Sequence, residues 1–280
     1  MNHNSGKPKV RLSSLSGFSN TEYKIHSQGI HTICESGLCP NKRECWGRGT
    51  ATFMILGDIC TRACKFCGVA TGKPKQPDMA EPEKLAKTIK DFGLKHVVLT
   101  SVDRDDLPDF GAAFWCETIS AIRKLNPQCT IETLIPDFKG IESLLDLIIT
   151  VAPEIVSHNT ETVRSLTPKI RSVATYDTSL KVLRYLSSKG IKTKSGIMLG
   201  LGETINEVLE TIADIRNTGC SILTIGQYFQ PSKTHFPVQA FLSKEVYDEL
   251  KVKALELGFK HVESGVLVRS SYHAETHLTD

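Results

Sequence analysis

The feature that most restricts the fold is a regular alternation of short apolar runs and helical patterns from residue 50 onward. The runs are rich in β-branched residues and are bounded by turn formers. They predict strands at residues 50–58, 95–100, 130–135, 154–157, 193–199 and 221–226, with a short last strand at 260–263. A helical pattern separates each strand from the next, which predicts a parallel sheet with right-handed crossovers.

The length of the alternating region, residues 50–264, suits six strand–helix units better than the eight of a closed barrel. The pattern alone allows a partial barrel or an open sheet. In both folds, ligands bind at the carboxyl ends of the strands. Four polar segments are expected at those ends: the loop that begins at Cys60, the loop 101–106 with Asp103 and Arg104, His158-Asn159, and Gln227-Tyr228.

Three cysteines follow the first predicted strand within eight residues. Cys60, Cys64 and Cys67 have the spacing C-x3-C-x2-C. Thiolates this close in sequence can ligate three irons of a cubane [4Fe-4S] cluster, which usually takes four cysteines. The fourth iron would then have a position open to an exogenous molecule. The alternative is a zinc knuckle, which needs a fourth ligand from a distant residue such as His96.

A second triplet, Cys34, Cys39 and Cys45, precedes the first strand with the spacing C-x4-C-x5-C. One or two zinc ions shared by all six thiols are an alternative. Zinc ribbons favour paired C-x2-4-C knuckles, and neither triplet divides into such pairs. Two separate iron–sulfur clusters, each one ligand short, fit the spacing better. The remaining cysteines are isolated and are predicted as structural thiols: Cys116, Cys129 and Cys220.

Composition limits the compartment and the partners. The formal charge of +3 and the pI of 8.3 are mildly basic, short of a dedicated nucleic-acid binder. No apolar run is long enough to span a membrane. Clustered cysteines without a recognisable secretory signal favour metal sites in a reducing compartment, so we expect the cytoplasm. Residues 1–21 hold three basic residues and no acid, which weakly suggests an organelle transit peptide, but a mobile tail over 1–29 is the preferred interpretation.

Several motifs resemble those of one protein family. The loop C-x3-C-x-φ-C, with Phe66 before its last cysteine, resembles the radical S-adenosylmethionine (SAM) signature. Residues 196–203 resemble the G-x-I-x-G-x-x-E pattern of radical SAM barrels, with Met198 at the isoleucine position. Both cysteine triplets, together with the segment Arg269-Ser-Ser-Tyr272, are similar to the lipoyl synthase family. The same family is resembled at residues 100–107, 193–196 and 226–232, and the match covers most of 30–274.

The resemblance implies a fold and a domain order. The fold would be α/β, a partial (β/α)6 radical SAM barrel with N- and C-terminal extensions that close the site. Residues 30–49 would carry an auxiliary cluster, residues 50–264 would form the barrel, and residues 265–280 would be a C-terminal tail that holds the auxiliary-cluster serine.

The resemblance also implies an activity, the insertion of sulfur at C6 and C8 of a protein-bound octanoyl-lysine. A cluster on Cys60, Cys64 and Cys67 would reduce SAM, and the resulting radical would take hydrogen from C6 and then C8. A second cluster would donate the sulfur atoms. Its ligands would be Cys34, Cys39 and Cys45 with Ser271 as the fourth. The predicted SAM contacts are Phe66, Asn159, Glu161, Arg171 and Met198.

The partners implied are an octanoylated lipoyl carrier protein, either an E2 lipoyl domain or the glycine cleavage H protein, and an electron donor such as ferredoxin or flavodoxin. Nucleic acid and membrane are not expected as partners. A rival interpretation is another radical enzyme with an auxiliary cluster, active on a free small molecule. The chain departs from the family at Gly37, where alanine is usual, at Ser172, where proline is usual, and at 7–10, where the family usually has a tryptophan.

Overall fold

The computed structural model describes residues 15–47 and 51–278. This chain forms two compact units. The N-terminal unit contains residues 15–47, 51–62 and 68–154, and the C-terminal unit contains 63–67 and 155–278. The region 50–264, predicted as one domain, is therefore divided between two units, because the backbone passes from one to the other within the Cys60–Cys67 loop and again before residue 155.

The N-terminal unit has a sheet in the strand order β1-β2-β5-β6. These strands are β1 (His31–Thr32), β2 (Thr52–Ile55), β5 (His96–Ser101) and β6 (Thr130–Leu134). All pairs are parallel except β1 with β2. A separate parallel pair, β3 (Ile59–Cys60) and β4 (Ala70–Thr71), brackets the cysteine loop. The predicted strands at these positions are confirmed, and residue 50 of the first one lies outside the described residues.

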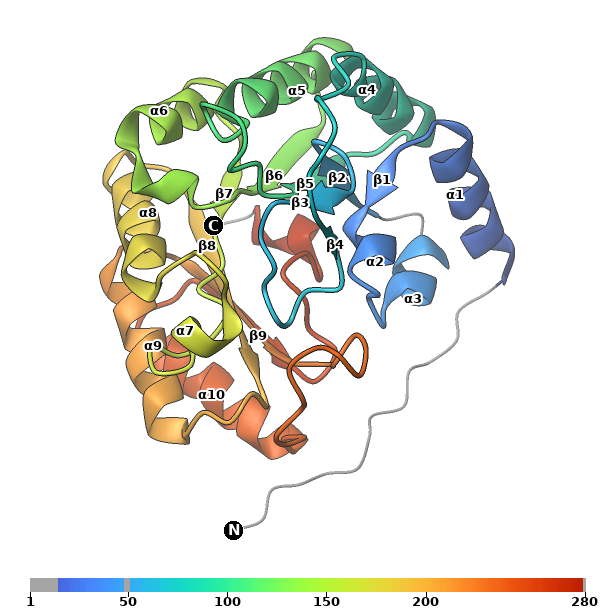
Figure 1. Ribbon diagram of the computed structural model, residues 1–280. Coiled ribbons are helices and arrows are strands. Elements are labelled where there is room, and N and C mark those ends of the chain that lie inside the picture. The colour runs from blue at the N-terminus through green and yellow to red at the C-terminus, as the bar shows by residue number, and fades with distance from the viewer. Residues whose placement is uncertain (1–14, 48–50, 279–280) are drawn as a thin grey trace. The chain divides into compact units, whose positions relative to one another are not determined.

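Three helices cover this sheet in a row (Figure 1). They are α4 (Glu81–Phe92), α5 (Ala112–Leu125) and α6 (Glu142–Thr150), with a 3-10 turn η1 (Phe138–Gly140) before α6. Pro82 lies in the first turn of α4, where its missing N–H costs no hydrogen bond, and Gly93 ends the helix in the left-handed conformation. A helix is therefore present where the helical pattern separates the first two predicted strands.

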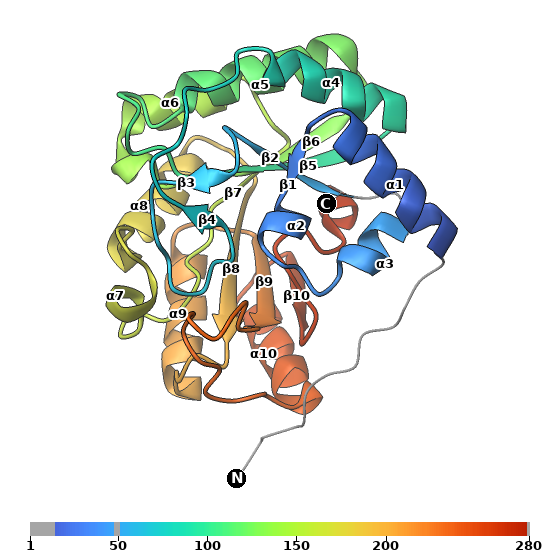
Figure 2. The same cartoon turned by 45° about the vertical axis from the view of Figure 1, so that its right-hand side comes forward.

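Part of the segment that was predicted as a mobile tail, residues 1–29, is helical. Residues Leu15–Ser27 form α1, which packs beside α3 (Lys42–Gly47) near α2 (Ile33–Ser36), as Figure 2 shows. Phe18 and Ile25, seven residues apart, lie on one helix face. Ile25 is fully buried, and Phe18 stacks on Trp46 with a centroid distance of 5.6 Å. Because most residues of the segment are polar, the sequence did not predict a helix with this narrow apolar face.

The C-terminal unit has a sheet in the order β7-β8-β9-β10, and every pairing between these strands is parallel. The strands are β7 (Ile155–Ser157), β8 (Thr193–Leu199), β9 (Ile222–Gln227) and β10 (His261–Gly265). The helices are α7 (Thr167–Ile170), α8 (Tyr176–Ser188), α9 (Ile205–Asn217) and α10 (Lys244–Glu256), followed by η2 (Ala274–His277). In Figure 1, α8, α9 and α10 follow one another along one side of β8 and β9.

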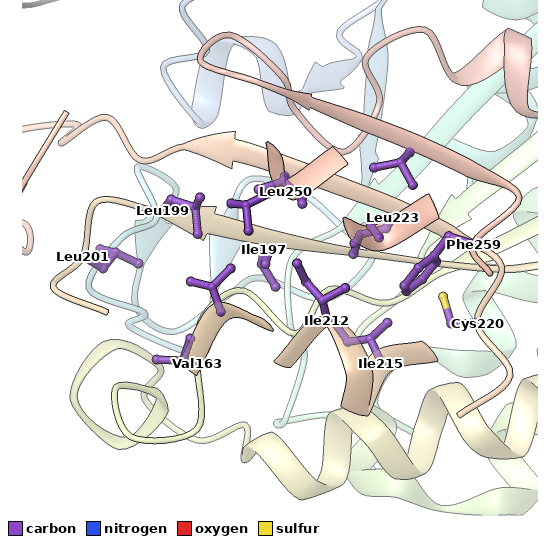
Figure 3. Packing of buried hydrophobic residues seen from close by; sticks show 14 of the residues in the cluster. Val163, Ile197, Leu199, Leu201, Ile212, Ile215, Cys220, Leu223, Leu250 and Phe259 are labelled. Carbon is purple, nitrogen blue, oxygen red and sulfur yellow. The ribbon is translucent and has the colours of Figure 1, made fainter. Parts of the chain in front are cut away.

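The core of the C-terminal unit lies between its strands and α8–α10. Figure 3 shows side chains of β8 and β9, such as Ile197, Leu199 and Leu223, facing Ile212 and Ile215 of α9. All five are less than 4% exposed. Burying one such side chain contributes about 1.5–3 kcal/mol, so this layer fixes the strands whose ends carry the candidate site. None of the helices within 15–47 and 51–278 has the length and apolarity to cross a membrane.

Candidate cluster and cofactor site

Cys60 ends the short strand β3 in the N-terminal unit. Its Sγ accepts hydrogen bonds from the backbone N–H groups of Arg62, at 3.4 Å, and of Asp103, at 3.3 Å. Hydrogen bonds from N–H groups to a cysteine sulfur tune an iron–sulfur cluster that the sulfur binds. Asp103, a polar candidate from the sequence, therefore contributes its backbone to the site.

The middle of the cysteine loop is held by the side chain of Arg62, which is 3% exposed. Its guanidinium donates two hydrogen bonds to Asp137, at 2.9 and 3.0 Å, and two to Asp105, at 2.7 and 2.8 Å. Asp103 lies 3.3 Å away as a third acid. The hydrogen bond from Arg62 keeps the pKa of the Asp105 carboxyl below its usual value. Sequence reasoning missed Arg62, although an arginine between two cysteines and an acid-rich loop at 103–106 were visible.

Arg104, the other polar candidate of that loop, is buried and pairs with Asp106 at 2.9 Å. It also donates to the Lys75 carbonyl oxygen at 2.9 Å. The hydrogen bond from Arg104 lowers the pKa of the Asp106 carboxyl. These contacts hold the 101–106 loop against the backbone of the N-terminal unit, which assigns Arg104 a structural role.

Residues 63–67 of the loop are held within the C-terminal unit. Backbone hydrogen bonds join Lys65 N–H to Ile170 O at 2.8 Å and Phe236 N–H to Lys65 O at 2.9 Å. Ser172 Oγ accepts the Ala63 N–H at 3.1 Å and lies 3.7 Å from Cys64 Sγ. Because that hydroxyl already accepts one hydrogen bond, its own proton can point to the Cys64 sulfur. Ser172, one of the positions that differ from the family the sequence resembles, thus contacts a candidate ligand.

The donor set of this loop fits an iron–sulfur cluster. None of the nine cysteines forms a disulfide. Within the described residues, no three His, Cys, Asp or Glu side chains converge as ligands of a single metal ion. A cubane takes one thiolate at each of three irons, so its cysteines do not converge on one ion. Cys60 Sγ accepts two N–H groups and Cys64 Sγ lies within hydrogen-bond distance of a hydroxyl, contacts that suit cluster ligands.

The first triplet lies on a two-helix motif of the N-terminal unit. Cys34 is in α2, Cys39 in the turn that follows, and Cys45 in α3. An ion pair of 2.7 Å between Glu35 and Lys42 ties the two helices together. Burial, the main cause, raises the pKa of the Cys34 thiol to about 11. The three sulfurs therefore lie on a short, internally braced segment, although sequence reasoning did not predict its helices.

Gly37, where the family usually has alanine, closes α2. A Cβ atom there would lie 2.7 Å from the carbonyl oxygen of Ile33. That contact is closer than a carbon atom normally approaches an oxygen, so the turn between Cys34 and Cys39 is shaped for glycine in this chain.

The residue pair Asn159 and Glu161 follows β7 in the C-terminal unit. Glu161 forms a bridge to β8: its N–H donates to Gly196 O at 2.9 Å, and its carbonyl accepts the Met198 N–H at 2.8 Å. Burial, the main cause, raises the pKa of the Glu161 carboxyl, while the charge of Arg171 and a hydrogen bond from Asn159 oppose the shift. The structure thus brings together Asn159, Glu161 and Met198.

The two remaining predicted SAM contacts lie in the same unit. Arg171 donates to Ser179 Oγ at 2.7 Å and to the Thr160 carbonyl oxygen at 3.4 Å. Phe66 packs, as Met198 does, against the buried cluster of the C-terminal unit. His158 is buried and forms a 3.0 Å hydrogen bond with Ser179 through Nε2, so it belongs to the packed interior.

The loop after β8 is held by Glu203. Its carboxylate accepts the backbone N–H groups of Gly200 and Leu201, at 2.5 and 2.9 Å. Gln227, at the end of β9, donates to Leu199 O at 3.1 Å and to Ala240 O at 3.0 Å. These bonds fix the glycine-rich turn at the carboxyl end of β8.

The segment Arg269-Ser-Ser-Tyr272 also packs on the strand ends of the C-terminal unit. A Cβ at Gly226 would lie 2.3 Å from the Val268 carbonyl oxygen, so only glycine permits this approach to β9. The Arg269 guanidinium lies 5.0 Å from the centre of the Phe229 ring. Ser271 is half-buried in a turn closed by the Tyr272 N–H, which donates to Arg269 O at 2.9 Å.

Comparisons with known proteins give consistent results. The family model described as the radical SAM superfamily matches residues 54–215. A protein named lipoyl synthase from Flavobacterium psychrophilum is 57% identical over 277 residues, which cover 98% of this chain and 96% of that protein. A protein named mitochondrial lipoyl synthase from Nematostella vectensis is 57% identical over 276 residues, covering 97% and 95%.

Solved structures show the same fold at low identity. The crystal structure of methylornithine synthase (PylB) matches with a TM-score of 0.57 and 16% identity over 92% of this chain and 81% of that one. Streptococcus suis SuiB, solved with S-adenosylmethionine bound, matches with a TM-score of 0.61 and 12% identity over 81% and 55%. The fold is the α/β partial barrel that the family resemblance implied, with a mostly parallel sheet that is not closed; the strand–helix alternation alone had also allowed an open sheet.

Proposed function

The chain belongs to the radical SAM superfamily and, within it, to the lipoyl synthase family. On that premise we propose a role for each candidate site residue. Its function is that of a lipoyl synthase, a sulfurtransferase that inserts two sulfur atoms at C6 and C8 of a protein-bound octanoyl-lysine. One observation carries this conclusion: 57% identity to a protein of that name over 98% of the chain. The cofactors are SAM and two 4Fe–4S clusters.

We assign the SAM-binding cluster to Cys60, Cys64 and Cys67. When bound, this cluster and SAM supply a 5′-deoxyadenosyl radical that takes hydrogen from the octanoyl chain. The contribution of the protein is to hold the ligands in place: Arg62 fixes the start of the loop within the N-terminal unit, and Ser172 contacts Cys64 within the C-terminal unit. A preorganised site of this kind needs no rearrangement when charge or spin develops.

We assign SAM contacts to Phe66, Asn159, Glu161, Arg171 and Met198. The support is that all five belong to the C-terminal unit and that Glu161 is joined to Met198 through the backbone. Aliphatic and aromatic side chains such as Met198 and Phe66 suit an adenine face, and Asn159 and Glu161 suit polar groups of the amino acid and ribose.

We assign the auxiliary cluster, which supplies the sulfur, to Cys34, Cys39, Cys45 and Ser271. A serine oxygen is a harder ligand than a thiolate and less suited to a soft cluster site. An iron held in that way should leave more readily when the cluster is taken apart. Closure of the site by the N- and C-terminal extensions belongs to the same proposal.

The reaction needs protein partners. We propose that the octanoyl chain is presented by a lipoyl carrier protein, an E2 lipoyl domain or the H protein of glycine cleavage. We propose ferredoxin or flavodoxin as the electron donor. The compartment we propose is the cytoplasm, where thiols that form no disulfide stay reduced.

The test begins with the iron and sulfide content of anaerobically purified protein. About eight irons are expected for two cubane clusters, and about four after Cys34→Ala, Cys39→Ala and Cys45→Ala are combined. Cys116→Ala, at an isolated thiol, is the control that should keep about eight. The protein is then incubated with SAM, a reductant and either octanoylated carrier protein or free octanoate. Lipoylation of the carrier alone is expected. Zinc without sulfide, or turnover of free octanoate, would contradict the proposal.

A further inference from the structure

The side chain of Asn159 has one amide end satisfied and the other open. Asn159 is 9% exposed and lies just beyond the carboxyl end of β7. Its Nδ2 donates a hydrogen bond of 2.7 Å to Ser270 Oγ. Its Oδ1 is buried and has no hydrogen-bond partner within 15–47 and 51–278. A buried acceptor without a partner is unfavourable, so Oδ1 is an acceptor available to a donor group of a ligand.

The orientation of this amide depends on the oxygen bound by its Nδ2, which is Ser270 Oγ. The other end of the amide lies close to the backbone of β8, since a Cβ at Gly196 would lie 2.8 Å from Asn159 Oδ1. With Nδ2 bound to Ser270, Oδ1 is directed away from that hydroxyl. Removal of the Ser270 hydroxyl would let the amide turn.

Ser270 is well placed to hold the amide because its own segment is fixed. The Val268 carbonyl oxygen lies against Gly226, where a Cβ would clash at 2.3 Å. The Arg269 guanidinium lies over the Phe229 ring. Both contacts come from the end of β9, while the Ser270 hydroxyl reaches the end of β7. The hydroxyl therefore connects a packed segment to the residue with the open acceptor.

We propose that Ser270 is a positioning residue for SAM: its hydroxyl fixes the Asn159 amide so that Oδ1 accepts a hydrogen bond from the ammonium or a ribose hydroxyl of the cofactor. The inference rests on the proposed function, in which Asn159 contacts SAM. It gives the two adjacent serines different roles. Ser271 is the proposed fourth ligand of the auxiliary cluster, and Ser270 orients Asn159 in the SAM site.

The experiment measures the Kd for SAM by anaerobic equilibrium dialysis with the fully reconstituted protein. Ser270→Ala is expected to weaken binding three- to tenfold, the effect of losing one hydrogen bond of about 1 kcal/mol. Ser270→Thr keeps the hydroxyl and is expected to stay within about twofold of the wild type. Iron and sulfide content, measured on the same samples, should not change in either variant, which separates positioning from loss of a cluster or of the fold.

A double-mutant cycle with Asn159→Ala completes the test. If Ser270 acts through Asn159, Ser270→Ala adds no further loss of SAM affinity in the Asn159→Ala background. Additive losses, or a Ser270→Ala variant that binds SAM as tightly as the wild type, would overturn the inference and leave the proposed function intact. Wild-type protein that carries both clusters and binds no SAM would overturn both.

Discussion

Replacement of Arg62 by alanine should destabilise the N-terminal unit more than any loss of a surface ion pair. The Arg62 side chain and its partner Asp137 are each only 3% exposed. Asp103 and Asp105 are 24% and 21% exposed on their side chains. The substitution would leave one deeply buried and two partly buried carboxylates without their shared counter-ion, and the three acids would repel one another.

The magnitude follows from the burial of the pair. Breaking a buried ion pair by removing one partner costs about 3–5 kcal/mol. Asp103 and Asp105 add less, since water screens them. A typical domain has about 5–15 kcal/mol of stability in total, so the loss is a large fraction. With a urea dependence of about 2 kcal/mol per M, the unfolding midpoint should fall by about 2 M.

The assay is urea unfolding followed by tryptophan fluorescence. The chain has two tryptophans, and Trp46 and Trp115 are both fully buried in the N-terminal unit. Arg62→Lys should lose less than Arg62→Ala, because lysine keeps the charge and cannot form two bidentate pairs. The control Lys84→Ala breaks a pair with Asp78 whose side chains are 51% and 59% exposed, and it should move the midpoint little.

The pH dependence gives a second signature. The Asp105 pKa is lowered in the folded protein, chiefly by its hydrogen bond with Arg62. A lowered carboxyl pKa stabilises the fold fully above the unfolded value of about 3.9, and the stabilisation is lost as pH falls through the folded value. In metal-free protein, the gap between wild type and Arg62→Ala should therefore be constant near neutrality and should narrow below about pH 4. A gap below about 1 kcal/mol at pH 7, or one that does not narrow in acid, would refute this account of the loop.

Three further changes test other parts of the structure. Burial, opposed by backbone hydrogen bonds, raises the pKa of Glu81 from 4.5 to about 7. The stability of the wild type should therefore fall as the pH rises from about 4.5 to about 7. Over the same pH range, the urea midpoint of Glu81→Gln should change less than that of the wild type. Gly226→Ala, whose Cβ would clash with the Val268 carbonyl oxygen at 2.3 Å, should speed amide hydrogen exchange in residues 268–272, and unchanged exchange would show that the clash is relieved elsewhere. Ser172→Ala removes the hydroxyl that lies 3.7 Å from Cys64 Sγ. The reduction potential of the cluster should become more negative by about 30 mV, which is a threefold change in a one-electron equilibrium. The potential is measured by an EPR-monitored redox titration, in which the control Ser172→Thr should stay near the wild type.

Much of the fold could be predicted because its signals are local. The strand expected at 193–199 matches β8 residue for residue, and the helix opened by Pro82 ends at the glycine that closes it. A buried parallel strand is rich in apolar and β-branched residues, as β8 is at residues 197–199, and a helix shows its own period and its own ends. Helix α1 was not predicted, because the apolar contacts that the structure describes for it, those of Phe18 and Ile25, lie within a polar segment.

For the candidate site, the sequence predicted the candidate ligands but not the residues that position them. Cysteine spacing identifies thiols that can bind metal, because the ligands themselves lie close in sequence. The residues that hold those ligands do not share this property. Arg62 meets Asp137 across 75 residues, and Asn159 meets Ser270 across 111. No local sequence pattern predicts such a pair, because each partner by itself resembles an ordinary polar side chain in a loop.

This difference also explains where the chain departs from its family. Both candidate triplets are complete, whereas Gly37 and Ser172 lie beside candidate ligands: Gly37 in the turn between Cys34 and Cys39, and Ser172 against Cys64. A ligand cannot change without loss of its metal bond, but a neighbour can change if the backbone or the hydrogen bonds adjust with it. In this chain the Ile33 carbonyl occupies the space that an alanine Cβ would need, and the Ser172 hydroxyl binds a backbone N–H of the cysteine loop, which a proline in its place could not do. The ligands therefore specify which cofactor is held, and their neighbours specify the geometry and potential at which it is held.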